Sequence, residues 1–192
     1  MKKLLVALVL TALAALTVDA QEAEKKKSEG DAMMEFYIEQ AKPVEEHERL
    51  AELAGPWKVT STMWFGDMAT SSAGTASGKM ILGGRFLEVG ADMKGELDAE
   101  FLTLMGFDRR TGEYTMIGLD TVGTYYITAA GRYDAAKKAV VLHGSYMQPP
   151  TNQEQKYYFV WTNPGPREHL MTLYFTMGGT DVRVAETKYT RE

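Results

Sequence analysis

The sequence contains no cysteine among its 192 residues, which excludes disulfide bonds and thiolate chemistry. Histidine is also scarce. The three histidines lie far apart, without the H-x-H or H-E-x-x-H spacing that is typical of zinc sites. The G-x-S-x-G motif of serine hydrolases is missing too. The sequence therefore predicts no metal ion, no cofactor and no catalytic residue, and a binding protein is favoured over an enzyme.

Long apolar runs are lacking except near the start, from Leu4 to Leu16. This run is too short for a membrane-spanning helix, which needs about 20 residues. Lys2 and Lys3 precede the run, and Val18 and Ala20 follow at small-residue positions. This order is typical of a signal peptide over residues 1–20, cut after Ala20. We therefore expect export to the periplasm or the extracellular space, without stable membrane insertion afterwards.

The charge of the chain is mildly negative, with a formal net charge of −5 at pH 7. A surface of this sign disfavours nucleic acid and anionic lipid as partners. Residues 21–43 predict a polar tether and one short helix from Ala32 to about Ala41. A second helix is expected from Val44 to about Ala54, where Gly55-Pro56 ends it. It opens the main domain, residues 44–192.

From Trp57 onward, apolar and polar residues alternate with the period of β-strands. Two connections are specific predictions: a loop from Asp67 to Ala73, and a two-residue hairpin turn at Gly83-Gly84. About ten short strands follow one another along the chain. A meander of this length removes its exposed edges by closing on itself. We therefore predict an all-β fold, a closed antiparallel up-and-down barrel of about ten strands with a short helical N-terminal cap.

Several stretches together resemble the bacterial domain of unknown function family 1579, over about residues 44–191. They are H-E-R-L-A-E-L-A-G-P-W (47–57), M-I-L-G-G-R-F-L (80–87), L-M-G-F-D-R-R-T-G-E-Y (104–114), L-D-T-V-G-T (119–124) and Y-T-R (189–191). The resemblance implies a lipocalin-like barrel without an established activity. Gly55-Pro56-Trp57 is also similar to the G-x-W that opens lipocalins. That similarity implies that Trp57 plugs the closed end beneath Arg191, so Gly55, Trp57 and Arg191 are expected to be structural residues. Gly83 and Gly84 are expected to be structural because of the hairpin turn.

The candidate ligand-binding residues are carboxylates and aromatic side chains within the predicted strands. Glu88 and Asp120 lie in strand-like runs, where they either face solvent or point into the barrel and orient a ligand. The aromatic candidates are Tyr125, Tyr157, Trp161 and Tyr174. Because a barrel of about eight to ten strands has room for a small ligand, the leading hypothesis is non-catalytic binding of a small apolar molecule inside the barrel.

Three alternatives remain open at this point. The first is a structural or interaction protein with a filled barrel, which docks a partner through the two-sided apolar strand from Tyr157 to Trp161. The second is a haem protein that uses His169, which shares a strand face with Met171, Leu173 and Phe175. The third, an enzyme with Glu88 and Asp120 as acid and base, has no motif to support it. The sequence leaves the oligomeric state undetermined.

Overall fold

The computed structural model of the protein describes residues 28–96, 98–149 and 151–191. The predicted signal peptide and the start of the tether lie outside these residues. The chain divides into two compact units, Met1–Lys42 and Pro43–Glu192. In the first unit, residues 28–40 are helical, so this helix includes residues before the predicted start at Ala32. No helix in the described part of the chain is long and apolar enough to cross a membrane.

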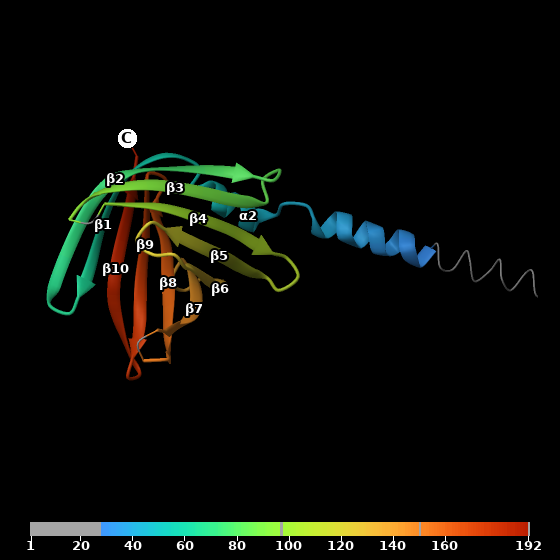
Figure 1. The fold of residues 1–192 in the computed structure, drawn as a ribbon. Coiled ribbons are helices and arrows are strands. Elements are labelled where there is room, and N and C mark those ends of the chain that lie inside the picture. Colours follow the sequence, from blue (N-terminus) through green and yellow to red (C-terminus); the bar gives the residue numbers. More distant parts are fainter. Residues whose placement is uncertain (1–27, 97, 150, 192) are drawn as a thin grey trace, which may run out of the picture. The chain divides into compact units, whose positions relative to one another are not determined.

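The second unit is a closed barrel of ten antiparallel strands preceded by one short helix, α2 (Figure 1). The prediction of an all-β barrel is confirmed. The elements are α2 (Glu45–Ala51), β1 (Gly55–Phe65), β2 (Met68–Ile81), β3 (Phe86–Gly95), β4 (Ala99–Asp108), β5 (Glu113–Asp120), β6 (Tyr126–Asp134), β7 (Ala139–Gln148), β8 (Gln153–Gly165), β9 (Glu168–Met177) and β10 (Thr180–Thr190). Each strand pairs with its neighbours in sequence, and β1 pairs with β10 to close the barrel.

Helix α2 is shorter than the predicted segment from Val44 to Ala54, and it packs against β3 and β4. Its first turn carries three glutamates, whose charge is favourable beside the positive end of the helix dipole. His47 adds a cap, because its Nδ1 accepts a hydrogen bond from the Val44 backbone N–H at 3.1 Å. Leu50 and Leu53 are buried in the core. The apolar side of this segment therefore closes one end of the barrel.

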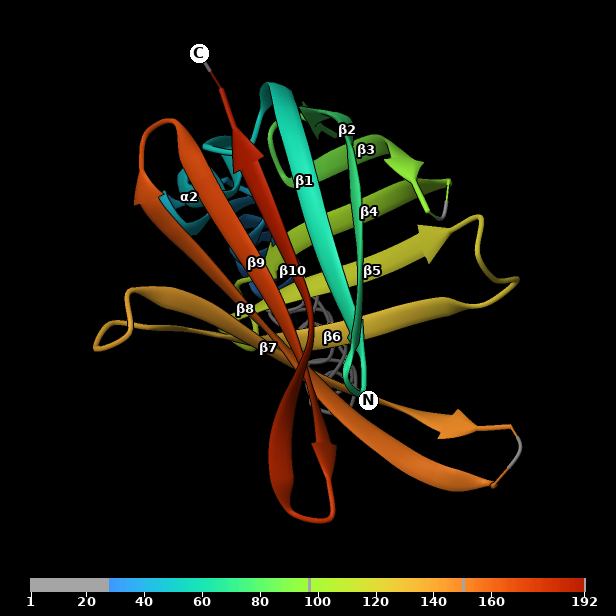
Figure 2. The ribbon, with the colours of Figure 1, turned by 90° about the vertical axis from the view of Figure 1, so that its left-hand side faces the viewer.

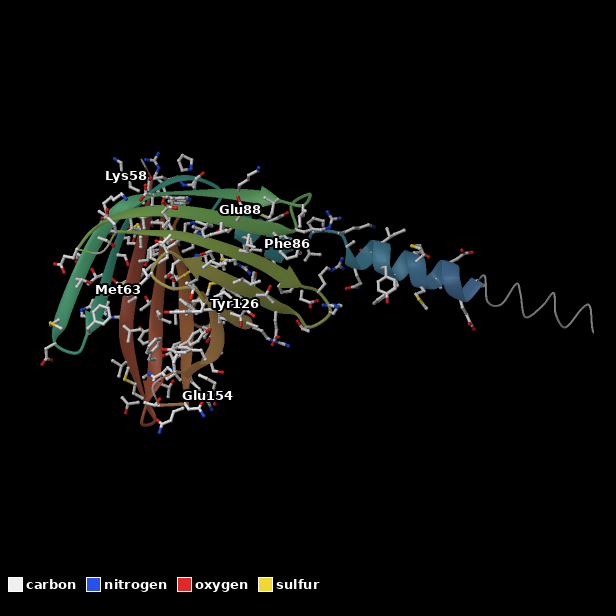
Figure 3. The ribbon with its side chains drawn as sticks, in the orientation of Figure 1. Lys58, Met63, Phe86, Glu88, Tyr126 and Glu154 are labelled. Atoms are coloured by element: carbon white, nitrogen blue, oxygen red, sulfur yellow. The ribbon has the colours of Figure 1, made fainter. Side chains whose placement is uncertain are left out.

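The register of the strands decides which side chains face inward. Trp57 lies opposite Ala76, and Val59 lies opposite Gly74 and Tyr189, with Trp57 and Val59 both buried in the core. Since strand residues alternate between the two faces, the odd-numbered residues of β1 face inward. The same reasoning on the other strands gives one continuous inward set around the barrel. Lys58 takes the opposite face, on the outer side of the wall (Figure 3).

Two predicted connections are wrong. Residues 68–73, predicted as part of a loop, form the start of β2, where they pair with the end of β1. Their small and polar side chains hid this strand, because cross-strand backbone hydrogen bonds rather than side-chain propensity hold it. The turn at Gly83-Gly84 comprises four residues, Leu82–Arg85, between the paired residues Ile81 and Phe86. The left-handed backbone extends to Leu82 as well as both glycines, so the predicted two-residue turn was too short.

The meander places its turns at two opposite ends of the barrel. The turns after β2, β4, β6 and β8 share one end with α2, and we call this the capped end. The turns after β1, β3, β5, β7 and β9 share the opposite end, which we call the open end. Figure 2 shows α2 near the β8–β9 turn, far from the β5–β6 and β7–β8 turns. The barrel therefore has one helix, over one of its two ends.

Candidate functional site

The capped end is held by a stack of Arg191 on Trp57, as the lipocalin similarity implied. The guanidinium carbon lies 3.7 Å from the centre of the Trp57 ring. The same guanidinium donates a hydrogen bond to the Glu52 carbonyl at 2.7 Å, and the Trp57 indole N–H donates to the Leu53 carbonyl at 2.9 Å. One residue after β10 therefore ties together the first strand and the segment that follows α2.

His169 completes this capped end from β9. It is only 1 % exposed, and its ring packs edge-on against Trp57 with centroids 4.9 Å apart. Its Nδ1 accepts a hydrogen bond from the Trp161 indole N–H at 3.2 Å. Burial lowers the pKa of His169, while a hydrogen bond to the Glu52 backbone acts in the opposite direction. The imidazole is therefore neutral and engaged in packing near pH 7.

This environment does not suit the haem alternative. An axial histidine must turn one ring nitrogen toward the iron, but the His169 nitrogens engage the Trp161 indole and the Glu52 backbone. Ligation would require these contacts to break. The ring is also shielded from solvent, because it packs against Trp57 and Trp161.

A surface hollow of about 530 Å³ lies beside this capped end, lined in part by Glu52, Asn163, His169 and Arg191. Its polar groups serve the fold itself. Asn163 donates a hydrogen bond to the Glu52 carboxylate, and Arg191 donates to the Glu52 carbonyl. The polar groups of the hollow are therefore engaged in hydrogen bonds that hold the capped end together. The candidate site lies elsewhere.

The interior at the open end is the candidate site. Inward-facing apolar side chains near the open-end turns remain exposed to solvent, in contrast to the buried residues of the same face near the cap. They include Met63 (37 %), Phe101 (38 %), Val182 (40 %) and Met177 (46 %). Figure 3 shows Met63 well down β1, away from Lys58 near the capped end. These residues lie at or near the ends of their strands, so the inward face presents apolar side chains to solvent at the open end.

The wall of the barrel also changes here, between β6 and β7. These strands pair only from Ala130–His143 to Asp134–Ala139, toward the capped end. Where the ladder stops, the Tyr157 hydroxyl from β8 donates to the Thr128 carbonyl at 2.7 Å. The Tyr157 ring crosses Gly144, where an added Cβ would lie 2.5 Å from the ring. The Tyr157 hydroxyl thus takes the place of a backbone N–H as the partner of the Thr128 carbonyl. Beyond this point β6 and β7 no longer pair, toward the open end.

The structure divides the six predicted ligand-binding residues. Glu88 lies opposite Lys79 and Leu104, between the buried Leu87 and Val89, so it faces outward and does not line the interior (Figure 3). Tyr174 also faces outward, stacked on Tyr158 with ring centroids 4.9 Å apart.

Three of the other four lie on the inward face, and Tyr125 lies in the β5–β6 turn. Asp120 is at the open end, where one of its carboxylate oxygens accepts the backbone N–H groups of Val122 and Gly123. Tyr125 lies in the same turn and is largely exposed. Tyr157 faces the interior, while Trp161 is buried beside His169 near the capped end. Asp120, Tyr125 and Tyr157 therefore belong to the open half, and Trp161 belongs to the cap.

Several residues of the open half were absent from the predicted site. They are Met63, Phe101, Tyr146, Phe175 and Val182, all on the inward face. Alternation alone would place Val182 outward, and the register shift between Arg183 and Ala185 turns it inward. The sequence also carried no sign of which end would stay open. Gly144 did carry a signal, because glycine inside a strand often marks a close approach.

The outer wall has an apolar area on a different side from the one predicted. Of the outward residues of β8, Tyr158 packs on Tyr174 and is only partly exposed. More apolar surface lies on β4 and β5, where Leu102 pairs with Leu119 and Leu104 pairs with Ile117. Tyr126 extends it from β6, opposite Leu119. The two-sided apolar strand from Tyr157 to Trp161 is thus not the most exposed apolar part of the wall.

Comparison with known proteins gives one family match and two solved structures of similar fold. The model of the family described as "Protein of unknown function (DUF1579)" matches residues 42–191. No curated protein matches the sequence. The crystal structure of Rv2717c from M. tuberculosis is similar, with a TM-score of 0.55 and 13 % identity, over 79 % of this chain and 99 % of that one. The S-type phycobiliprotein lyase CPES from Guillardia theta has a TM-score of 0.50 and 10 % identity, over 81 % and 96 %. These two likenesses show a shared fold.

We predict that Arg191→Ala lowers the free energy of unfolding by about 2–3 kcal/mol, because it removes both the stack on Trp57 and a charged hydrogen bond. Arg183→Ala is the matched control. Arg183 lies 4.3 Å from the centre of the Trp64 ring and pairs with Glu186 at 3.0 Å, but it is exposed on the outer face, so its loss should cost about 0.5 kcal/mol. Urea unfolding measures both variants. Equal effects of the two substitutions would contradict the role of Arg191 in closing the barrel.

We predict that stability falls as the pH drops below about 6.5, the ordinary pKa of histidine. The folded-state pKa of His169 is lowered by burial, so the unfolded chain takes up a proton that the folded protein refuses. His47, whose pKa burial also lowers, adds to the effect. His169→Gln should flatten the change in melting temperature between pH 8 and pH 5. His143→Gln, at an exposed outer position, controls for the loss of one imidazole, and an unchanged slope in His169→Gln would refute the assignment.

Proposed function

We propose that this chain, which belongs to the DUF1579 family of proteins of unknown function, is a non-catalytic carrier of a small apolar molecule. The observation that carries the proposal is the exposure of inward-facing apolar side chains at the open end, among them Met63 and Phe101. When a ligand covers apolar surface that faces inward yet meets water, the burial favours binding by roughly 2.5 kcal/mol per 100 Å².

The shape of the barrel supports this proposal over a filled structural barrel. The buried core is concentrated toward the capped end, around Trp57, Leu87 and Leu142. Toward the open end, Ile127, Tyr146 and Phe175 are only partly buried, although they face inward. A structural barrel would gain by packing this half as tightly as the other. The incomplete packing is what a ligand site of this fold requires.

The test is binding of the uncharged fluorescent probe N-phenyl-1-naphthylamine, whose emission rises in apolar surroundings. Ala91 faces the interior of β3 opposite Phe101, whereas Ala73 is exposed on the outer face of β2. We expect Ala91→Trp to weaken probe binding at least about tenfold by filling the site, and Ala73→Trp to leave it unchanged. Thr187→Phe, on the inward face of β10, repeats the block if Ala91→Trp unfolds. Absence of probe binding to the unaltered protein, or equal effects of inward and outward variants, would refute the carrier function.

Export is part of the same proposal. Its support is the arrangement of Lys2, Lys3 and the apolar run that follows them. We predict that the protein isolated from its own cells has an intact mass corresponding to a chain that starts at Gln21. A mass that retains residues 1–20 would contradict cleavage after Ala20.

A further inference from the structure

We propose that the ligand of this site carries no negative charge, so that the carrier rejects fatty acids and other apolar anions in favour of neutral molecules of the same length. This inference rests on the proposed carrier function and narrows it. It follows from where the charged side chains of the barrel lie.

The inward face carries no positive charge anywhere along the ten described strands. Every lysine and arginine of these strands alternates onto the outer face, as the pairing shows: Lys58, Lys79, Lys94, Arg132, Lys156, Arg183 and Lys188. Asp120 is the one carboxylate on the inward face, and its charge already accepts two backbone N–H groups. An anionic headgroup inside the barrel would therefore find no cation to pair with.

The turns at the rim of the open end also contain no cation that could pair with an anionic headgroup. Its five connecting turns contain Asp67, Glu96 and Asp98, and no lysine or arginine. The nearby Lys94 is on the outer face, and its ammonium is already paired with Asp92 at 3.2 Å and Asp98 at 3.4 Å. An anion that left its headgroup at the mouth would thus face carboxylates instead of cations.

The arginines that do reach the interior of the fold belong to the capped end. Arg49 donates to the Tyr114 hydroxyl at 2.8 Å and lies over the Tyr133 ring. Arg191 is held by Trp57 and the Glu52 carbonyl. The core layer that includes Leu87, Met105 and Leu142 lies between this end and the open half. These two cations are therefore out of reach of a ligand that enters from the mouth.

Apart from Asp120, the polar side chains that line the open half are neutral. Ser61 and Thr187 face each other across the β1–β10 pair, with their hydroxyl oxygens 3.0 Å apart. The Tyr157 hydroxyl is occupied by the Thr128 carbonyl. Hydroxyl groups can orient an alcohol, ester or ketone, but they do not repay the cost of desolvating a carboxylate. The lining therefore favours a neutral ligand over an anion of the same length.

The experiment compares two molecules of equal chain length as competitors of N-phenyl-1-naphthylamine: 1-decanol and decanoate, at pH 7.5. We expect 1-decanol to displace the probe at concentrations at least about tenfold lower than decanoate. Decanoate that competes as well as 1-decanol would overturn the inference while leaving the carrier function intact. Failure of both the probe and 1-decanol to bind would instead refute the carrier function itself.

A second experiment tests whether the missing inward cation is the reason that anions bind poorly. Met63→Lys places an ammonium on the inward face near the mouth, in a side chain of similar length, whereas Thr60→Lys places it on the outer face of the same strand. We expect Met63→Lys to improve decanoate binding about tenfold, with no gain in Thr60→Lys. Equal responses of the two variants would show that the missing inward cation is not the reason for selectivity, and the inference would fall.

Discussion

The stack of Arg191 on Trp57 is the interaction on which the rest of the barrel depends. It lies where the first strand, the last strand and the segment after α2 meet, and it is completed by the hydrogen bond from Arg191 to the Glu52 carbonyl. His169 and Trp161 fill the space beneath it with a second indole and a neutral imidazole. Because this end is packed with large rings, α2 has a firm surface to cover, and the barrel needs no disulfide to stay closed.

Because the tightly packed core near the cap stabilises the barrel, the open end can remain less tightly packed. Core residues such as Leu87 and Leu142 lie toward the cap, while Met63 and Phe101 face inward but meet solvent. The β6–β7 ladder stops at Ala130 and His143, and Tyr157 holds the Thr128 carbonyl where the next backbone partner would be. The same strands therefore form a packed core at one end and leave inward apolar side chains exposed at the other.

The distribution of charge also differs between the capped end and the open half. Arg49 and Arg191 reach inward only at the capped end, where aromatic rings and a carbonyl engage them. The open half has hydroxyls and apolar side chains inside, with carboxylates such as Asp67 and Glu96 in its turns. A protein with this arrangement differs from a binder of anionic lipids, which would require cations inside its mouth. The family match and the two similar structures leave the ligand open, so the internal chemistry is the guide to it.

The sequence by itself determined the all-β barrel, because the period of two from Trp57 onward and the regular turns allow few other folds. It also determined the inward face of β1 and the G-x-W resemblance that paired Trp57 with Arg191. Tertiary structure alone decided the start of β2, since backbone pairing with β1 holds residues whose own propensity is weak. It decided that Glu88 and Tyr174 face outward, because the facing of a polar residue in a strand depends on register. It decided above all which end is open, a property of how ten strands meet that no local pattern records.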